Sequence, residues 1–194
     1  DRSSAASDVY KRQAENELDK WLYLNYTVPY NIEVVYRWDA AQSYSSLSEV
    51  QLVPVEFDAV QPMMAALRDV WFKPYIQATG NSLDFLKEVA PKKIVLVGSP
   101  EYQNGSFKLG QAEGGRKILL LNVNNFDASN ENELKEALHT IVHEFTHILH
   151  QTKLFDKKYQ EISTGRYNSN WTLLKDPEAR RLGFITSYAM LNKD

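Results

Sequence analysis

Cysteine is absent from the 194-residue chain, which excludes disulfides, iron–sulfur clusters, thiolate zinc sites and cysteine nucleophiles. Long apolar runs are also missing, because stretches such as Ile94–Val97 and Ile118–Leu121 fall far short of the roughly 20 residues that cross a bilayer. Basic residues are not in surplus either: 22 Lys and Arg stand against 25 Asp and Glu, for a net charge of −3. This balance gives no support to a nucleic acid or an anionic membrane as partner.

What the chain does contain is the composition of a folded globular protein, with 43% hydrophobic and 24% charged residues. Its length suits one domain that buries most of its unfolded surface. Residues 1–13 are polar, lack periodicity and resemble the translated read-through of a sequencing-library adapter; the alternative is a frayed native terminus. We therefore expect a single domain over residues 14–194, an internal fragment of a longer protein that is truncated at the C-terminus.

Hydrophobic periodicity and turn residues divide this domain into elements. Runs rich in β-branched and aromatic residues predict strands over residues 31–38, 92–98 and 117–123. Apolar residues at helical spacing predict helices over residues 15–25, 56–79 and 82–89. Polar and turn-forming residues predict loops over residues 39–55 and 99–116. Pro29 is expected to end the first helix and Pro74 to kink or end the second, in which Pro62 is tolerable only near the first turn. The pattern predicts an α+β fold with a small sheet.

One more helix, over residues 130–151, carries the candidate chemistry. It begins with Asn130, a good N-cap, and Glu133 follows three residues later as in a capping box. Apolar residues between Leu134 and Leu149 form one broad stripe, which predicts the buried face. All four histidines of the protein lie on roughly the opposite side of this helix: His139, His143, His147 and His150.

His143, Glu144 and His147 form an H-E-x-x-H pattern. Residues four apart on a helix lie about 5–6 Å apart at Cβ, so both imidazoles can bind one Zn²⁺ at about 2.0–2.1 Å. Glu144 lies beside such a metal, where it can act as general base on a zinc-bound water. The pattern predicts the Zn²⁺ site of a metallohydrolase; the alternative is a solvated helix face.

The third zinc ligand is less well defined. Catalytic zinc sites commonly have three protein ligands and an open position, and the third histidine of the longer H-E-x-x-H-x-x-G-x-x-H pattern is absent. His150 is one candidate, with orienting a neighbour or lining the cleft as alternatives, whereas His139 is expected at the surface or in the cleft. Glu178 is another candidate, although Asp176 and Pro177 predict a helix start at which Glu178 only complements the helix dipole.

Several distinctive stretches are spread over residues 15–194: WLYLNYTVPYNIEVVY (21–36), KIVLVGS (93–99), LGQAEGGRKILLLN (109–122), HEFTHILHQT (143–152) and GFITSYAM (183–190). They resemble the substrate-import-associated zinc metallohydrolase lipoproteins, a family of zinc-binding metallopeptidases. The resemblance implies a zincin-like fold, in which a small mixed sheet packs on the long helix that bears His143, Glu144 and His147. It also implies that an acidic segment after the GFIT-like motif supplies the last zinc ligand, which is then expected beyond Asp194.

The resemblance further implies a lipid-anchored protein of the bacterial envelope, facing the periplasm or the exterior and associated with a TonB-linked nutrient importer of the outer membrane. Together with the residues, it predicts zinc-dependent hydrolysis of peptide bonds in a peptide or protein substrate. One alternative is a non-catalytic envelope binding or accessory protein with a structural or vestigial zinc site. Another is a hydrolase that acts on a different bond, such as an amide of a cell-wall substrate.

Two further places are candidates for substrate contact. Leu109–Gly115 is glycine-rich and precedes a predicted strand, so we expect a hairpin turn or an exposed edge strand that holds substrate by β-addition, and the two are compatible. Tyr188 could donate a hydrogen bond to a developing oxyanion, with packing as the alternative. The four tryptophans are expected in the core or the cleft, where a carbohydrate-stacking platform is a further alternative.

Overall fold

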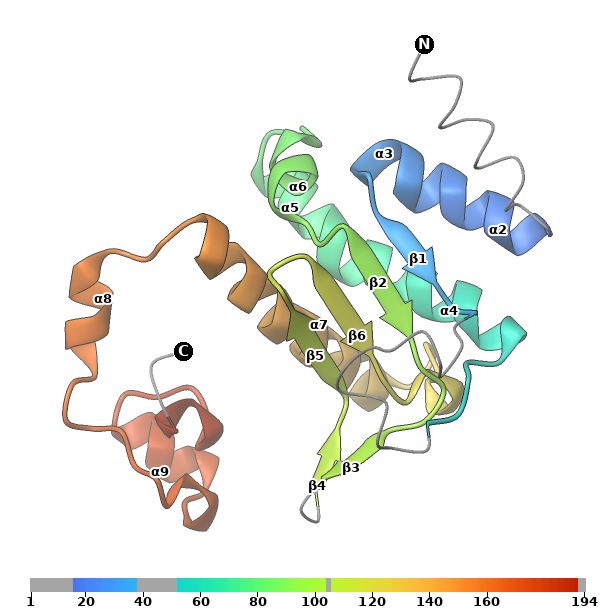
Figure 1. The fold of residues 1–194 in the computed structure, drawn as a ribbon. Coiled ribbons are helices and arrows are strands. Elements are labelled where there is room, and N and C mark those ends of the chain that lie inside the picture. Colours follow the sequence, from blue (N-terminus) through green and yellow to red (C-terminus); the bar gives the residue numbers. More distant parts are fainter. Residues whose placement is uncertain (1–15, 38–51, 104–105, 192–194) are drawn as a thin grey trace. The chain divides into compact units, whose positions relative to one another are not determined.

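A computed structural model describes residues 16–37, 52–103 and 106–191 of the chain (Figure 1). The adapter-like segment 1–13 and most of the predicted loop 39–55 lie outside the described residues. The chain divides into two compact units, residues 1–152 and residues 153–194, and each is described by itself. Within the described ranges, none of the helices has the length and apolar character needed to span a bilayer.

The first unit opens with a helical segment that is longer than predicted. Helix α2 spans Glu17–Leu22, a π-helical turn η1 spans Tyr23–Thr27, and α3 spans Val28–Tyr30. The expectation that Pro29 ends the helix is wrong by one residue, because the helical backbone continues through Pro29, just after the π-helical turn, as far as Tyr30. The segment ends at Asn31, which adopts the left-handed conformation with φ 57°.

The second helical segment is also continuous through its prolines. Helix α4 spans Phe57–Leu67, the π-helical turn η2 spans Arg68–Phe72, α5 spans Lys73–Ala78, and α6 spans Asp84–Val89. Pro62 lies inside α4, beyond the first turn where we expected it to be tolerable. Pro74 lies in the first turn of α5, directly after the π-helical turn. The helix predicted over residues 56–79 is therefore present, and neither proline ends it.

Four short strands form the main sheet in the order β1-β2-β6-β5. Strands β1 (Glu33–Val35), β2 (Lys93–Leu96) and β6 (Lys117–Leu120) are parallel, whereas β5 (Gly110–Glu113) runs antiparallel to β6. A separate antiparallel pair consists of β3 (Glu101–Gln103) and β4 (Ser106–Lys108). The three predicted strands and the small mixed sheet are confirmed. The region 99–116, predicted as a loop with an edge strand as one alternative within Leu109–Gly115, contains three more strands.

The long helix α7 (Glu131–Thr152) lies on the same face of the sheet as α4 and α5 (Figure 1). The 3₁₀ turn η3 (Val123–Asn125) connects β6 to it. Alternate strand residues face these helices in the main core, including Ile94, Leu96, Ile118 and Leu120. Their neighbours face the other side of the sheet, where Val95, Val97, Leu119 and Leu121 form a second buried cluster. Both faces of the sheet are thus apolar, as is usual for parallel strands.

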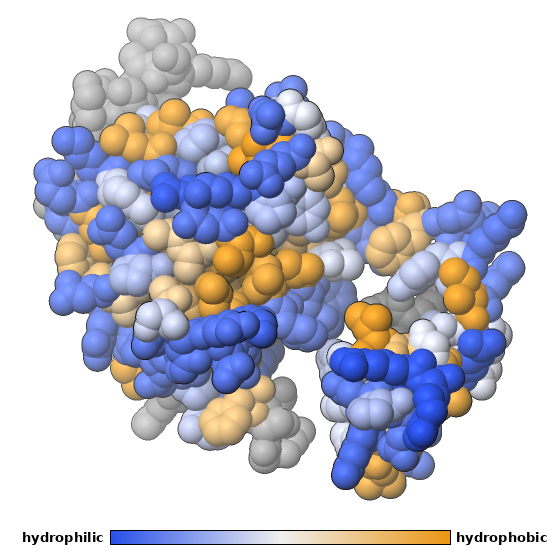
Figure 2. Space-filling view, turned by 180° about the vertical axis from the view of Figure 1, so that it is seen from behind, coloured by the Kyte–Doolittle hydropathy of each residue, from blue (hydrophilic) through white to orange (hydrophobic). Residues whose placement is uncertain are grey.

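The second unit is small and mostly helical. Helix α8 spans Lys157–Ile162, the 3₁₀ turn η4 spans Trp171–Leu173, α9 spans Asp176–Arg181, and the 3₁₀ turn η5 spans Tyr188–Met190. Ala179, Phe184 and Met190 form its buried cluster. Figure 2 shows hydrophobic residues at the surface of this unit. Leu173 and Ile185 are among its exposed large apolar side chains.

Candidate metal centre

Helix α7 forms where the sequence predicts it, because its start is capped locally. The side-chain oxygen of Asn130 accepts a hydrogen bond from the backbone N–H of Asn132 at 3.0 Å, and the amide of Asn130 donates to Glu133 at 2.9 Å. Ile141, Phe145 and Ile148 form the buried face of the helix. The ring of Phe145 packs edge-on against Trp71 and Tyr75, with ring centroids 5.2 and 5.3 Å apart. This packing fixes the rotation of α7 and turns its histidine-bearing side away from the core.

His143 and His147 meet on that side of the helix. Their Nε2 atoms are 3.1 Å apart and the rings are almost perpendicular, at 88°. Two nitrogens that bind one tetrahedral ion at about 2.0–2.1 Å stand about 3.3 Å apart, so the observed spacing fits a shared Zn²⁺. The two imidazoles can therefore hold a metal with little rearrangement.

The surroundings of His143 favour the protonation state that a metal ligand needs. Burial lowers the pKa of His143 below its ordinary value of 6.5; Glu144 opposes this shift, and His147 and His139 add to it. A lowered pKa keeps the imidazole neutral at neutral pH, and only the neutral ring has a free lone pair for a cation.

Glu144 is held against the edge strand of the sheet. Its Oε2 atom accepts a hydrogen bond from the backbone N–H of Ala112 in β5 at 2.6 Å. The strand can approach this closely because residue 110 is glycine: a Cβ there would lie 2.5 Å from Thr140 Cγ2 and 3.2 Å from Glu144 Cγ. Neither contact is evident from the sequence. Ala112 takes part only through its backbone N–H, and Gly110 matters only because it has no side chain.

Strand β5 is the outer strand of the main sheet. The amide of Leu121 donates to the carbonyl of Leu109, so in this antiparallel ladder the polar groups of Gly110 and Ala112 point away from β6. The segment Leu109–Gly115 therefore contains both of the structures considered in the sequence analysis. It forms an edge strand, which is followed by a turn in which Gly114 and Gly115 have positive φ.

Comparison with known proteins agrees with this geometry. A profile of the family described as "Putative zinc-binding metallo-peptidase" matches residues 11–194. The chain is also similar to the crystal structure of "a putative zinc-binding metallo-peptidase" from Bacteroides caccae ATCC 43185, with a TM-score of 0.68 and 35% identity, covering 93% of this chain and 68% of that chain. The chain belongs to this family. No curated protein matches it.

Membership in the zinc-binding metallo-peptidase family confirms the resemblance on which the sequence analysis relied, and supports zinc as the cofactor.

Family membership does not identify the third zinc ligand. Among the residues that the structure describes, no group of three or more His, Asp or Glu side chains is arranged to hold a metal ion. His139 stacks on His143 with ring centroids 6.5 Å apart, and its side chain is exposed, as expected. His150 is half-buried near the end of α7 and stays a candidate.

The remaining candidates lie in the second unit. The carboxylate of Glu178 accepts a hydrogen bond from the backbone N–H of Lys175 at 2.9 Å, which is the helix-capping role weighed against ligation in the sequence analysis. Helix α9 starts at Asp176, where Asp176 and Pro177 predict a helix start, and its N-cap is Lys175. The Asp176 carboxylate accepts a hydrogen bond from the N–H of Ser187 at 2.9 Å. Tyr188 is half-exposed and packs edge-on against Trp171, and its role in substrate binding stays a prediction.

Proposed function

We propose that the protein is a zinc-dependent metallohydrolase that cleaves peptide bonds, with His143 and His147 as metal ligands and Glu144 as general base. The observation that carries the proposal is the 3.1 Å separation of the two Nε2 atoms on one helix, with the intervening carboxylate of Glu144 held beside them by β5. When bound, zinc supplies a Lewis acid that polarises a carbonyl group and acidifies water.

The chain's own residues would supply the positioning and the proton transfer. The N–H of Ala112 holds one carboxylate oxygen of Glu144, which leaves the other oxygen able to accept a proton from a water molecule. The same carboxyl group can then return that proton to the leaving amine. Glu144 directly follows His143 in the chain, so its carboxylate and the metal ligand would act at the same reaction centre.

The outer edge of β5 supports a peptide as substrate. The N–H and C=O of Gly110 and the C=O of Ala112 face outward and can pair with an extended backbone, whereas the N–H of Ala112 already donates to Glu144, which therefore lies at the same edge. An extended peptide bound there would pass the proposed reaction centre. The third ligand is proposed to come from an acidic residue beyond Asp194. The envelope location and the importer as partner rest on the motif resemblance alone and stay predictions.

The decisive experiment compares Glu144→Gln with the wild type in a chain extended to the end of the parent gene. We expect the variant to retain zinc, measured by plasma mass spectrometry, and to lose about 10²–10⁴-fold in peptide hydrolysis. Glu131→Gln is the matched control, since it makes the same charge change at an exposed position of the same helix. Unchanged hydrolysis in Glu144→Gln would remove this residue from the mechanism.

A non-catalytic binding protein with a structural or vestigial zinc site is the second candidate. Its basis is the pair of imidazoles of His143 and His147, since a vestigial site would keep these two ligands without a third. The same experiment separates the two functions, because a structural site predicts retained zinc with no hydrolysis in the wild type as well as in the variant.

A further inference from the structure

The first unit contains a small cavity that the proposed metal centre does not use. It has a volume of about 50 Å³ and lies between α7, α4, the end of β6 and the residue before β5. Apolar side chains form most of its wall, including Met63, Leu67, Leu120 and Phe126. A space of this size takes about three to five water-sized groups, which corresponds to the stem of one long side chain.

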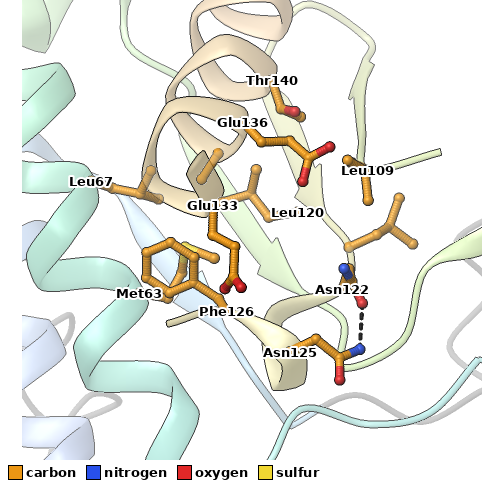
Figure 3. A pocket seen from close by; sticks show the side chains of 12 residues that line it. Met63, Leu67, Leu109, Leu120, Asn122, Asn125, Phe126, Glu133, Glu136 and Thr140 are labelled. Atoms are coloured by element: carbon orange, nitrogen blue, oxygen red, sulfur yellow. Dashed lines mark hydrogen bonds between the residues drawn. The ribbon is translucent and has the colours of Figure 1, made fainter. Parts of the chain in front are cut away.

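Among the described residues, the charged side chains that line this cavity are those of Glu133 and Glu136, and none of the lining side chains is cationic. Glu133 is fixed in place, because its carboxylate accepts hydrogen bonds from the N–H of Asp127 at 2.7 Å and from the amide of Asn130 at 2.9 Å. Within the described parts of the chain, the exposed side chain of Glu136 has neither a hydrogen bond nor an ion pair. Figure 3 shows both side chains reaching from α7 toward the space beside Leu109 and Phe126.

The cavity lies beside the path that a bound peptide would follow. Strand β5 runs along α7, since Gly110 lies against Thr140 and Ala112 against Glu144. Thr140 also lines the cavity, which therefore lies one helical turn before Glu144. A strand added to the edge of β5 sends alternate side chains toward α7. A peptide bond held near Glu144 thus brings a neighbouring side chain over the cavity.

We propose that this cavity is a specificity pocket for a lysine or arginine side chain beside the cleaved bond, an inference that rests on the proposed function. The aliphatic stem of such a side chain fits the apolar walls, while its cationic end reaches the carboxylates of Glu133 and Glu136. An acidic side chain is repelled there, and an aliphatic one leaves the two carboxylates without a counter-charge. The pocket thereby selects substrates with a basic residue at one position.

The first test needs no turnover. N-acetyl-lysine N-methylamide and its uncharged analogue N-acetyl-norleucine N-methylamide are titrated into the zinc-free 194-residue chain, and methyl NMR signals are followed. We expect the lysine probe to shift the signals of Leu109 and Leu120 and to bind at least threefold more tightly than the norleucine probe. Glu136→Gln should abolish this difference. Glu131→Gln, at an exposed position paired with Lys135, should preserve it. Equal binding of the two probes to the wild type would overturn the proposal.

A cleavage experiment separates this pocket from the proposed function. A peptide library is digested with the zinc-loaded chain, extended to the end of the parent gene. We expect cleaved sequences to carry Lys or Arg at one fixed position, and Glu136→Gln to lower kcat/KM for them about threefold to fivefold. Cleavage without a basic preference would remove the pocket and leave the function. Selective binding of the lysine probe without any cleavage would leave the pocket and remove the function.

Discussion

Gly110 determines how closely the edge strand approaches the metal-binding helix. A Cβ at this position would meet Thr140 Cγ2 at 2.5 Å, which is too close without a shift, and Glu144 Cγ at 3.2 Å, which is a tight contact. The close approach brings the N–H of Ala112, two residues later, within 2.6 Å of the Glu144 carboxylate. A residue without a side chain therefore controls where the proposed general base lies.

We expect Gly110→Ala to displace β5 from α7 and to misplace Glu144. The overpacking should lower the free energy of unfolding by about 1–3 kcal/mol, and kcat/KM for peptide hydrolysis should fall about tenfold or more. The zinc dissociation constant should change much less, because His143 and His147 both belong to α7. Chemical denaturation, steady-state kinetics and zinc titration measure the three quantities separately.

A rescue variant shows whether Thr140 is the obstacle. Thr140→Ser removes the Cγ2 atom that the new methyl group would strike, so the double variant Gly110→Ala/Thr140→Ser should recover most of the lost activity and stability. A double variant as impaired as Gly110→Ala alone would contradict this account of the strand's position.

At the scale of elements, Tyr26 connects the π-helical turn η1 to α4. Its side chain is fully buried, its ring lies 5.9 Å from that of Phe72, and its hydroxyl donates a hydrogen bond to the carbonyl of Met64. Burial raises the pKa of Tyr26 above its ordinary value of 10.0, although Arg68 opposes the shift. The phenol therefore stays protonated in the folded chain at pH values where it ionises in the unfolded one.

This raised pKa predicts that stability falls in alkali. The contribution of Tyr26 is fully present below about pH 10 and is lost as the pH rises, because above pH 10 only the unfolded state releases the proton. The slope for this one group reaches about 1.4 kcal/mol per pH unit. Tyr26→Phe should reduce the slope by about that amount and should cost about 1 kcal/mol at pH 8 through the lost hydrogen bond. Denaturant titrations from pH 8 to pH 12 measure both quantities, and a variant with the wild-type slope would contradict the prediction.

The elements also show which parts of the fold can be predicted from local sequence. Helix α7 is predicted within one residue, because its cap and its apolar stripe are both local features. Strands β3 and β4 are not predicted, and β5 is one of two alternatives considered for Leu109–Gly115. Segments of three or four residues with Gly, Gln and Lys become strands only through pairing. The π-helical turns have no sequence signature here. In η2 the adjacent residues Trp71 and Phe72 are both buried, and this burial depends on tertiary packing that the local sequence does not reveal.

The candidate site likewise has features that local sequence predicts and features that depend on the fold. The spacing of His143, Glu144 and His147 predicts their meeting, because four residues make about one helical turn. The contact between Ala112 and Glu144 joins residues 32 positions apart through a backbone amide, and any residue except proline supplies such an amide. Sequence patterns therefore identify the candidate ligands and the base, while the partner that positions the base emerges only from the fold.

At the scale of the whole molecule, the two units differ greatly in buried apolar surface. The first has a large core on one face of the sheet and a second cluster on the other. In the part of the second unit that the structure describes, Ala179, Phe184 and Met190 are the buried residues. This unit exposes large apolar side chains such as Leu173, which is 81% exposed. Because hydrophobic burial is the main stabilising contribution to folding, the intrinsic stability of the second unit must be low.

We therefore expect the second unit to open at much lower free energy than the first. Amides of α8 and α9 should exchange with solvent hydrogen at least 10²-fold faster than amides of β2 and β6, because local opening of a small, weakly packed unit requires little exposure of core. Phe184→Ala should accelerate exchange in α9 further and leave β2 and β6 unchanged, since its side chain belongs to the second unit's own cluster. Hydrogen–deuterium exchange with mass spectrometry follows both sets of amides at once. Equal protection in the two units would mean that the second gains stability from contacts beyond its own core, and Phe184→Ala would then affect β2 and β6 as well.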